Sequence, residues 1–451
     1  PVARQMIQFR IDTLKEAMDR AADLHLPRGA IYPFRTINGT ECHASTTPSL
    51  RLHMNADIAL AIQLFEAVTG DAGLMATGGG ANVVMATALI WLEWGTWDGG
   101  EFHIRHVTGP DEYKALVHDD CYTNIMAREH LRYAAELARR VKATAPAAWR
   151  DVEATVHMCF ERDVPAFDNA AKSMFIPFDP KRHLYLQDES FLRKKPWSAS
   201  PFLASSDRHR AEAVLIEQHH PLSVYRHQLC KQADVVLCHV VLSHSFTTDE
   251  KRASFAFYES LTTQDSSLTA STFSMMASEL RDTEKALEYY RRTLFVDLLN
   301  IVGNTGTGIH ASAMAGSWSC VVRGFAGMRF DHGRLRFDPY LPNGWDSFAF
   351  SVCYARVVIR VHVRRRHVVY SALDGKSCVI YHRDAAVHLS RNKPVTVSLI
   401  TDLRATSFDG VIFDLDTIIP HVEDDHFVAW KRVLDPLLFA SSSVTATPTA
   451  A

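Results

Sequence analysis

Hydrophobic residues recur at helical spacing through most of the chain. Within 118–145, apolar residues return every three or four positions with charged residues between them, as on an amphipathic helix that buries one face. The segment 229–243 is apolar on nearly all sides, which is typical of a helix packed between neighbours, whereas 280–299 mixes leucines with charges. This alternation of inner and outer helices predicts a helical toroid over residues 1–328.

The period of the pattern changes to two after residue 328. From Val357 to Val363, β-branched residues alternate with polar and charged ones such as Arg360 and His362, which predicts a strand with one buried face. Further short runs of this kind follow. We therefore predict a small antiparallel β-domain over 329–402 and a mainly α fold, in which an (α/α)6 toroid barrel precedes a β-sandwich.

The C-terminal part of the chain has a third pattern. Within 403–440, a buried strand ends in Asp414 and Asp416 and is followed by an amphipathic helix. Residues 441–451 are only Ser, Thr, Ala, Val and Pro, and they are predicted to be disordered.

Composition and charge narrow the classes of partner. The chain of 451 residues is 47% hydrophobic and 22% charged, and its net charge of -3 gives no long-range attraction to nucleic acid or to an anionic membrane. Its apolar runs are shorter than the roughly 20 residues of a membrane helix. The eight cysteines lack metal-ligand spacing, so we expect reduced thiols, no metal site and a cytoplasmic protein.

One loop carries candidate catalytic chemistry. In the run 107–113, a Gly-Pro turn is followed by Asp111, Glu112 and Tyr113, just before the helix predicted within 118–145. The run could simply be a helix-capping turn. A carboxyl group on a rigidly held loop also suits the general acid of a sugar-cleaving enzyme, whose pKa is raised by apolar or aromatic surroundings. Glu112 is the candidate for that acid.

Several runs occur together, in order, in one family. They are Tyr32-Pro33-Phe34-Arg35-Thr36-Ile37-Asn38-Gly39, His53-Met54-Asn55-Ala56-Asp57-Ile58, Thr108-Gly109-Pro110-Asp111-Glu112-Tyr113 with Tyr122-Thr123-Asn124, Lys231-Gln232-Ala233-Asp234-Val235, and Gly308-Ile309-His310-Ala311-Ser312. Over about residues 1–400 the chain thus resembles the glycoside hydrolase family 65 phosphorylases, which act on maltose, trehalose or kojibiose.

The resemblance implies a reaction and an acid. Glu112 would protonate the glycosidic oxygen of an α-linked glucosyl disaccharide while inorganic phosphate attacks the anomeric carbon, giving β-glucose 1-phosphate with inversion. Phosphate is a nucleophile at neutral pH, so this reaction needs no cofactor and no second carboxylate as base.

The resemblance also implies binding residues. Ser266, Ser267 and His310, from the segments 264–268 and 308–310, would bind phosphate through hydroxyl and imidazole groups without a metal. For the sugar, the implied contacts are Lys231, Gln232, His53 and Asp111. The alternatives are that Lys231 and Gln232 merely open a helix and that His53 belongs to a capping network. Trp318 is expected in the core.

Some features depart from the family. Its members begin with a β-sandwich domain and a first barrel helix that do not precede Pro1, so we expect this sequence to be an internal piece of a longer chain. Within 403–440 the sequence resembles the start of a haloacid dehalogenase-like β-phosphoglucomutase, with Asp414 as phosphoryl acceptor; we expect this copy to be inert. Two alternatives to a phosphorylase stay open, a family 65 hydrolase and a non-catalytic remnant, and the family also implies a possible homodimer.

Overall fold

The computed structural model describes residues 2–42, 50–197, 219–263, 266–301, 303–331 and 333–399. The chain divides into two compact units, residues 1–399 and 400–451. The predictions for 403–440 and 441–451 lie outside the described residues, and every helix, strand and site residue named from here on belongs to the first unit.

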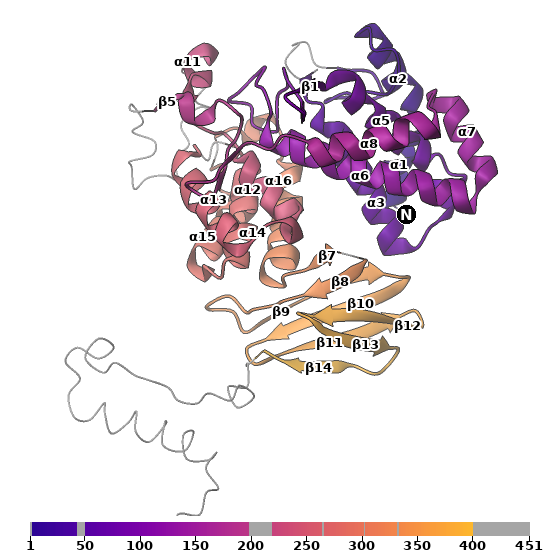
Figure 1. Cartoon of the computed structure of the whole chain (residues 1–451). Helices are drawn as coiled ribbons and strands as arrows, with labels where there is room; N and C mark the ends of the chain where they lie inside the picture. The colour runs from indigo at the N-terminus through magenta and orange to yellow at the C-terminus, as the bar shows by residue number, and fades with distance from the viewer. Residues whose placement is uncertain are drawn as a thin grey trace, which may run out of the picture. The chain divides into compact units, whose positions relative to one another are not determined.

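Helices dominate the described residues up to Phe325 (Figure 1). The first group contains α1 (Val2–Asp12), α2 (Leu14–Asp23), α3 (His53–Thr69), α4 (Gly73–Ala76), α5 (Gly80–Trp94), α6 (Cys121–Thr144), α7 (Pro146–Val156) and α8 (Phe160–Ser173). The second contains α11 (Pro221–Tyr225), α12 (Asp234–Val241), α13 (Thr248–Leu261), α14 (Thr269–Glu279), α15 (Thr283–Phe295), α16 (Ala311–Ser319) and the π-helical turn η5 (Cys320–Phe325). Short connecting strands are β1 (Thr96–Asp98), β2 (Glu101–His103), β3 (Phe178–Asp179), β4 (Leu184–Tyr185), β5 (Lys195–Pro196) and β6 (His227–Gln228).

The helices pack in the succession expected of a toroid. Helices α3, α6, α12, α14 and α16 contact one another in that order, and α13 and α15 pack beside α12 and α14. Helix α12 is buried on nearly all sides, whereas α15 alternates buried and exposed residues, as the two hydrophobic patterns predicted. The predicted fold class is confirmed: a helical toroid followed by a small β-domain.

Two helix starts matter for the site. Helix α6 begins at Cys121 because the Asp120 side chain caps it, accepting a hydrogen bond of 2.9 Å from the Thr123 backbone N–H. Helix α12 begins only at Asp234, so Lys231 and Gln232 lie in the segment that precedes it rather than in its first turn.

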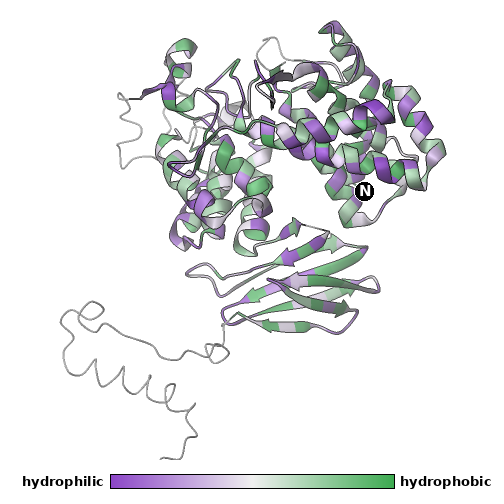
Figure 2. Ribbon diagram, in the orientation of Figure 1, coloured by the Kyte–Doolittle hydropathy of each residue, from purple (hydrophilic) through white to green (hydrophobic). Residues whose placement is uncertain are grey.

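The β-domain consists of two four-stranded sheets. Its strands are β7 (Arg329–Asp331), β8 (Arg334–Phe337), β9 (Ser347–Tyr354), β10 (Val357–Arg364), β11 (His367–Asp374), β12 (Ser377–His382), β13 (Ala385–Ser390) and β14 (Val395–Ser398). The sheet orders are β14-β11-β10-β9 and β13-β12-β8-β7, and all neighbours are antiparallel except β8 and β12, which pair in parallel. Strand β10 alternates buried and exposed residues as predicted, and hydropathy alternates along the strands in Figure 2.

One prediction about the core is wrong. Trp318 on α16 is 51% exposed, and Met314, one turn earlier on the same face, is 52% exposed, so this face of the helix is open to solvent.

The eight cysteines are all free thiols. No helix among the described residues is long and apolar enough to cross a bilayer. The same residues contain no cluster of His, Cys, Asp and Glu suited to a metal ion.

A buried charge cluster connects the helical part to the β-domain. Glu279, the last residue of α14, accepts hydrogen bonds from Lys251 of α13 at 2.5 Å, from Ser243 at 2.6 Å and from Arg329 of β7 at 2.6 Å. Burial alone would raise the pKa of Glu279, but Arg329 and Lys251 outweigh it and lower this pKa to about 2.

This cluster predicts a loss of stability in acid. Because the folded-state pKa of Glu279 lies below its unfolded value of about 4.3, its contribution is complete above that pH and disappears as the pH falls toward 2. Between pH 7 and pH 3 the expected loss from this group is about 1.5–2 kcal/mol in the free energy of unfolding. Urea denaturation at these two pH values measures it.

Other carboxylates also titrate in that range, so the comparison is between variants. Glu279→Gln should be less stable than the wild type at pH 7 but should lose less stability on acidification. Glu101→Gln, which alters an exposed carboxylate on β2, serves as the control and should keep the wild-type pH dependence. Equal pH dependence in wild type and Glu279→Gln would contradict the assignment.

Candidate active site

The candidate acid Glu112 lies in a loop between β2 and α6. Backbone hydrogen bonds of 3.1 and 2.9 Å, one in each direction, join Val107 to Val117 and close the loop. Asp119 fixes its base, because its backbone N–H donates to Ile104 O at 2.8 Å and its side chain accepts from the Ile104 N–H at 3.1 Å. The loop therefore holds Glu112 on a rigid support, as catalytic side chains require.

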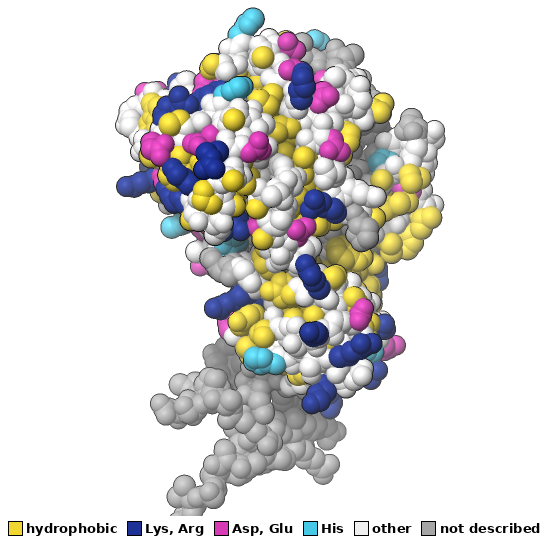
Figure 3. Space-filling view, turned by 90° about the vertical axis from the view of Figure 1, so that its right-hand side faces the viewer, with side chains coloured by type: hydrophobic (Ala, Val, Ile, Leu, Met, Phe, Trp, Pro, Cys, Tyr) yellow, Lys and Arg dark blue, Asp and Glu magenta, His cyan; other side chains and the backbone are white. Residues whose placement is uncertain are grey.

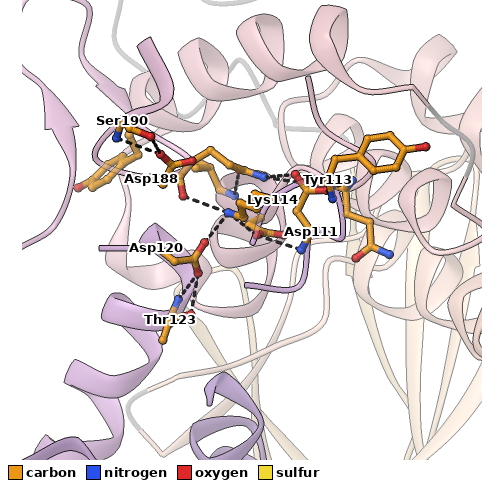
Figure 4. Close-up of polar contacts among 12 residues, drawn as sticks. Asp111, Tyr113, Lys114, Asp120, Thr123, Asp188 and Ser190 are labelled. Atoms are coloured by element: carbon orange, nitrogen blue, oxygen red, sulfur yellow. Dashed lines mark hydrogen bonds and ion pairs between the residues drawn. The ribbon is translucent and has the colours of Figure 1, made fainter. Parts of the chain in front are cut away.

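A cluster of buried charges lies under this loop (Figure 4). Lys114, whose side chain is 2% exposed, donates to Asp120, to Asp234 at 2.8 Å and to the Gln187 backbone O at 3.2 Å. Burial alone would lower the pKa of Lys114, but the surrounding carboxylates, Asp120 foremost, outweigh it and raise this pKa well above its ordinary value. One ammonium group thus ties the loop to the starts of α6 and α12.

The glycine in the loop is required by this cluster. A Cβ atom on Gly109 would lie 2.5 Å from Asp120 Oδ2 and 2.6 Å from Asp234 Oδ2. Atoms do not approach so closely without displacement, so any side chain at Gly109 would push the two carboxylates away from Lys114. The Gly-Pro turn of the sequence is therefore explained by the close approach of backbone to buried charge.

Asp111 supports the site from beneath. It is 1% exposed, and its Oδ1 accepts from the backbone N–H groups of Tyr113, Lys231 and Gln232 at 3.1, 3.0 and 3.3 Å, while Oδ2 accepts from Gln187 Nε2 at 3.2 Å. Burial raises the pKa of Asp111. The direct sugar contact expected for Asp111 stays a prediction. In this structure the carboxylate is enclosed and positions the segment that carries Lys231.

Glu112 itself is paired with two cations. Its Oε2 lies 2.5 Å from Lys231 Nζ and its Oε1 lies 3.4 Å from Arg51 Nη2, and its side chain is 35% exposed. The Arg51 guanidinium stacks over the Phe34 ring at 4.1 Å from the centroid. Partial burial would raise the pKa of Glu112, but Lys231, helped by Arg51, lowers it below its usual value.

This pairing shifts the pKa of Glu112 in the direction opposite to the one expected from the sequence. Apolar surroundings were expected to raise the pKa of Glu112, whereas two cations hold the carboxylate ionised. Lys231, expected to contact the sugar, faces the acid directly.

The next contact leads to the expected phosphate segment. Gln232 Nε2 donates to Ser266 Oγ at 2.9 Å, and Ser266 Oγ also accepts from the Leu268 backbone N–H at 3.3 Å. Thr269 donates to the Lys231 backbone O at 2.9 Å, which attaches this segment to the one that holds Lys231. Glu112, Lys231, Gln232 and Ser266 are thereby brought into one group. Ser267 is partly exposed beside Ser266, and Gln264 and Asp265 lie outside the described residues.

His310 is held by a different partner. Its ring Nδ1 lies 2.5 Å from Asp297 Oδ1, and its backbone N–H donates to Asp297 Oδ2 at 2.9 Å, just before α16 begins. With Nδ1–H donating to Asp297, Nε2 is the ring atom left for a ligand. Within the described residues, no hydrogen bond joins His310 to Ser266 or Glu112.

His53 is the first residue of α3 and pairs with the side chain of Asp57 one turn later. Its Nδ1 is 2.9 Å from Asp57 Oδ2, and Asp57 Oδ1 accepts from the Tyr122 hydroxyl at 2.8 Å. The side chain is 5% exposed and its Nε2 has no partner among the described residues. These contacts are between side chains and do not cap the backbone of α3. Within the described residues, no hydrogen bond links His53 to Glu112.

Sequence reasoning missed Arg51, Lys114, Asp120 and Asp234 as parts of the site. Lys114 and Asp234 stand inside or beside runs already singled out, and their charges between apolar neighbours were the available signal. Arg51 carries no comparable signal, because only the fold brings it to Glu112, 61 positions later in the chain.

Comparisons with known proteins identify the family of this chain. Residues 1–319 match the glycosyl hydrolase family 65 central catalytic domain, and residues 328–389 match the glycosyl hydrolase family 65, C-terminal domain. An α,α-trehalose phosphorylase of Geobacillus stearothermophilus is 35% identical over 88% of this chain and 51% of its own length. The maltose phosphorylase of Bacillus subtilis is 31% identical over 83% and 48%, respectively.

A solved structure supports the fold. A putative kojibiose phosphorylase from the human microbiome superposes with a TM-score of 0.79 at 23% identity, covering 88% of this chain and 51% of its own. The chain therefore spans about half the length of the relatives it matches. Because the catalytic-domain match covers most of the sequence and includes the Glu112 loop, the chain belongs to glycosyl hydrolase family 65.

Proposed function

We propose that this protein catalyses inverting phosphorolysis of an α-linked glucosyl disaccharide of the trehalose, maltose or kojibiose type. The proposal rests on the contact series from Glu112 through Lys231 and Gln232 to Ser266, which unites a carboxyl group with a polar cradle. The names of the relatives, trehalose and maltose phosphorylases among them, support the same class of reaction.

In the proposed reaction, Glu112 donates its proton to the glycosidic oxygen as the bond to the anomeric carbon breaks. A phosphate oxygen forms the new bond from the opposite face, so the products are β-glucose 1-phosphate and a free sugar, and Glu112 is left as a carboxylate. Since phosphate is already a nucleophile, no base is required. Asp111 in the Glu112 loop and Asp234, which accepts from the Asp111 backbone N–H, are fully buried, which favours a phosphorylase over a hydrolase that must activate water.

The ionised state of Glu112 requires a step before catalysis. A donor must be protonated, and the Lys231 ion pair opposes protonation. We propose that the bound glucosyl group takes over the Lys231 ammonium by hydrogen bonding to its hydroxyls. Loss of that cation raises the pKa of Glu112 and prepares it to accept and deliver a proton. In the reverse, synthetic direction, the ionised Glu112 is already the base.

The first test is a substrate panel. Purified protein is incubated with trehalose, maltose or kojibiose, with and without inorganic phosphate, and β-glucose 1-phosphate and glucose are measured. Phosphate-dependent release of β-glucose 1-phosphate from one of them is expected. Glucose release at the same rate without phosphate would instead identify a hydrolase, and no release from any disaccharide would support a non-catalytic remnant.

The phosphate cradle makes a separate prediction. Ser266→Ala with Ser267→Ala should raise the KM for phosphate by roughly tenfold or more, because two hydroxyl donors to an anion are lost, while the KM for the disaccharide changes little. His310→Ala should act in the same direction, because it removes the imidazole that is expected to contact phosphate. Steady-state kinetics with each substrate varied in turn measures both constants.

Ser260→Ala is the matched control, because that hydroxyl lies on the exposed side of α13 and donates only to the Phe257 backbone O. Equal increases in both Michaelis constants for the double Ser variant would indicate a structural role of the loop.

A homodimer and a cytoplasmic location stay predictions from the sequence.

A further inference from the structure

A cavity lies away from the Glu112 loop, where the end of α14 and η5 meet the β-domain. Its volume is about 330 Å³, and its lining includes Arg281, Arg336, Arg383 and Asp338, with Glu279, Ser243 and Arg329 of the buried charge cluster. Cavities of this size are large enough for a small ligand. Nothing in the proposed phosphorolysis uses it.

Glu279, which lines the cavity, has no carboxylate oxygen left for a ligand. Both carboxylate oxygens of Glu279 are occupied, one by Lys251 and Ser243 and the other by Arg329. Because two cations, Lys251 and Arg329, contact this one carboxylate, the Glu279 cluster carries a net positive charge.

Two arginines at the rim share one carboxylate. Arg281 from the helical part donates Nη2–H to Asp338, and Arg383 from the turn after β12 donates Nε–H to Asp338 Oδ1 at 2.9 Å. Their side chains are 41% and 46% exposed. Arg281 Nη2 also donates to the Asp338 backbone O at 3.3 Å. No hydrogen bond within the described residues involves Arg281 Nε or Nη1, or Arg383 Nη1 or Nη2, so donors outnumber acceptors at the rim.

A third arginine is also incompletely paired. Arg336 of β8 donates to Asp331 Oδ2 at 2.8 Å, but its Nη1 is 3.8 Å from Asp384 Oδ1, beyond hydrogen-bond distance. The Asp384 side chain is 99% exposed and extends into water. Arg336 therefore keeps donor groups available to the cavity.

The whole β-domain adds to this positive field. Residues 328–399 contain twelve Lys and Arg against five Asp and Glu, although the complete chain has a net charge of -3. Figure 3 shows dark-blue Lys and Arg side chains distributed over this lower part of the molecule. A positive region around a cavity raises the local concentration of anions.

We propose that this cavity binds a phosphate group, either of a phosphorylated sugar or of inorganic phosphate, through Arg281, Arg336 and Arg383. Guanidinium groups match phosphate oxygens in paired hydrogen bonds, and three of them converge here from two parts of the fold. The lining contains none of the residues assigned to phosphorolysis, so the ligand would occupy a site separate from that of the proposed reaction.

Isothermal titration calorimetry with glucose 6-phosphate, inorganic phosphate and glucose tests this site. The protein used carries Ser266→Ala and Ser267→Ala, which weaken the proposed catalytic phosphate cradle. Binding of glucose 6-phosphate or phosphate, but not of glucose, is expected. Arg336→Gln and Arg383→Gln in that background should each weaken it roughly tenfold or more, because a charge-assisted hydrogen bond is lost. Tighter binding of the ester than of free phosphate would identify a sugar phosphate as the ligand.

Two further variants separate binding from folding. Asp384→Asn removes an exposed negative charge beside Arg336 and should tighten binding by roughly twofold to fivefold without affecting stability. Arg360→Gln removes an equal charge from the exposed face of β10, away from the cavity, and should change affinity little. No binding of either phosphate ligand, or affinities unchanged by Arg336→Gln and Asp384→Asn, would overturn the proposal.

Discussion

Glu112→Gln should reduce phosphorolysis of the disaccharide by about 10²–10⁴-fold, because the amide preserves the shape of the side chain but cannot donate a proton. The effect should appear in kcat, while the KM for phosphate changes little. Initial rates of β-glucose 1-phosphate formation, measured at saturating phosphate, give the comparison.

A substrate that needs no acid provides the control for this variant. α-Glucosyl fluoride releases fluoride without protonation, so Glu112→Gln should retain most of its activity on this substrate with phosphate. Glu101→Gln, at an exposed carboxylate on β2, should behave as the wild type on both substrates. If Glu112→Gln keeps more than half the wild-type rate on the disaccharide, Glu112 is not the acid.

Lys114→Met should lower the free energy of unfolding by about 3–5 kcal/mol, because it leaves Asp120 and Asp234 buried without their shared cation. Part of the loss can be relieved by protonation of Asp234, whose pKa is raised by burial. Chemical denaturation at pH 7 measures the change. Activity should fall as well, since the loop that holds Glu112 is anchored by the same ammonium group.

A rescue experiment distinguishes lost charge compensation from lost packing. Lys114→Met combined with Asp234→Asn should be more stable than Lys114→Met alone, because one uncompensated charge is removed. Lys15→Met, which breaks an exposed ion pair with Asp19, should leave stability unchanged. A Lys114→Met protein within about 1 kcal/mol of the wild type would contradict the role given to the cluster.

The sequence predicted the parts of the fold that depend on local periodicity. Apolar spacing located α6, α12 and α15, and alternation located β10, because each element must bury one face or all of its surface. The parallel pairing of β8 with β12 was missed, since it joins strands that are distant in the chain and no local pattern specifies it. The exposure of Trp318 was missed for a related reason: periodicity gives the face of a helix but not what covers it.

The sequence predicted which residues belong to the candidate site better than it predicted the contacts between them. Local order along the chain was enough to predict that Glu112 stands in a Gly-Pro loop before a helix, and that Lys231, Gln232 and Ser266 are polar groups of their segments. The contact of Lys231 with Glu112 across 119 positions and the enclosure of Asp111 depend on how distant segments fold together. The pairing with Lys231 reverses the expected pKa shift of Glu112, because a pKa depends on burial and on neighbouring ions that distant segments bring together.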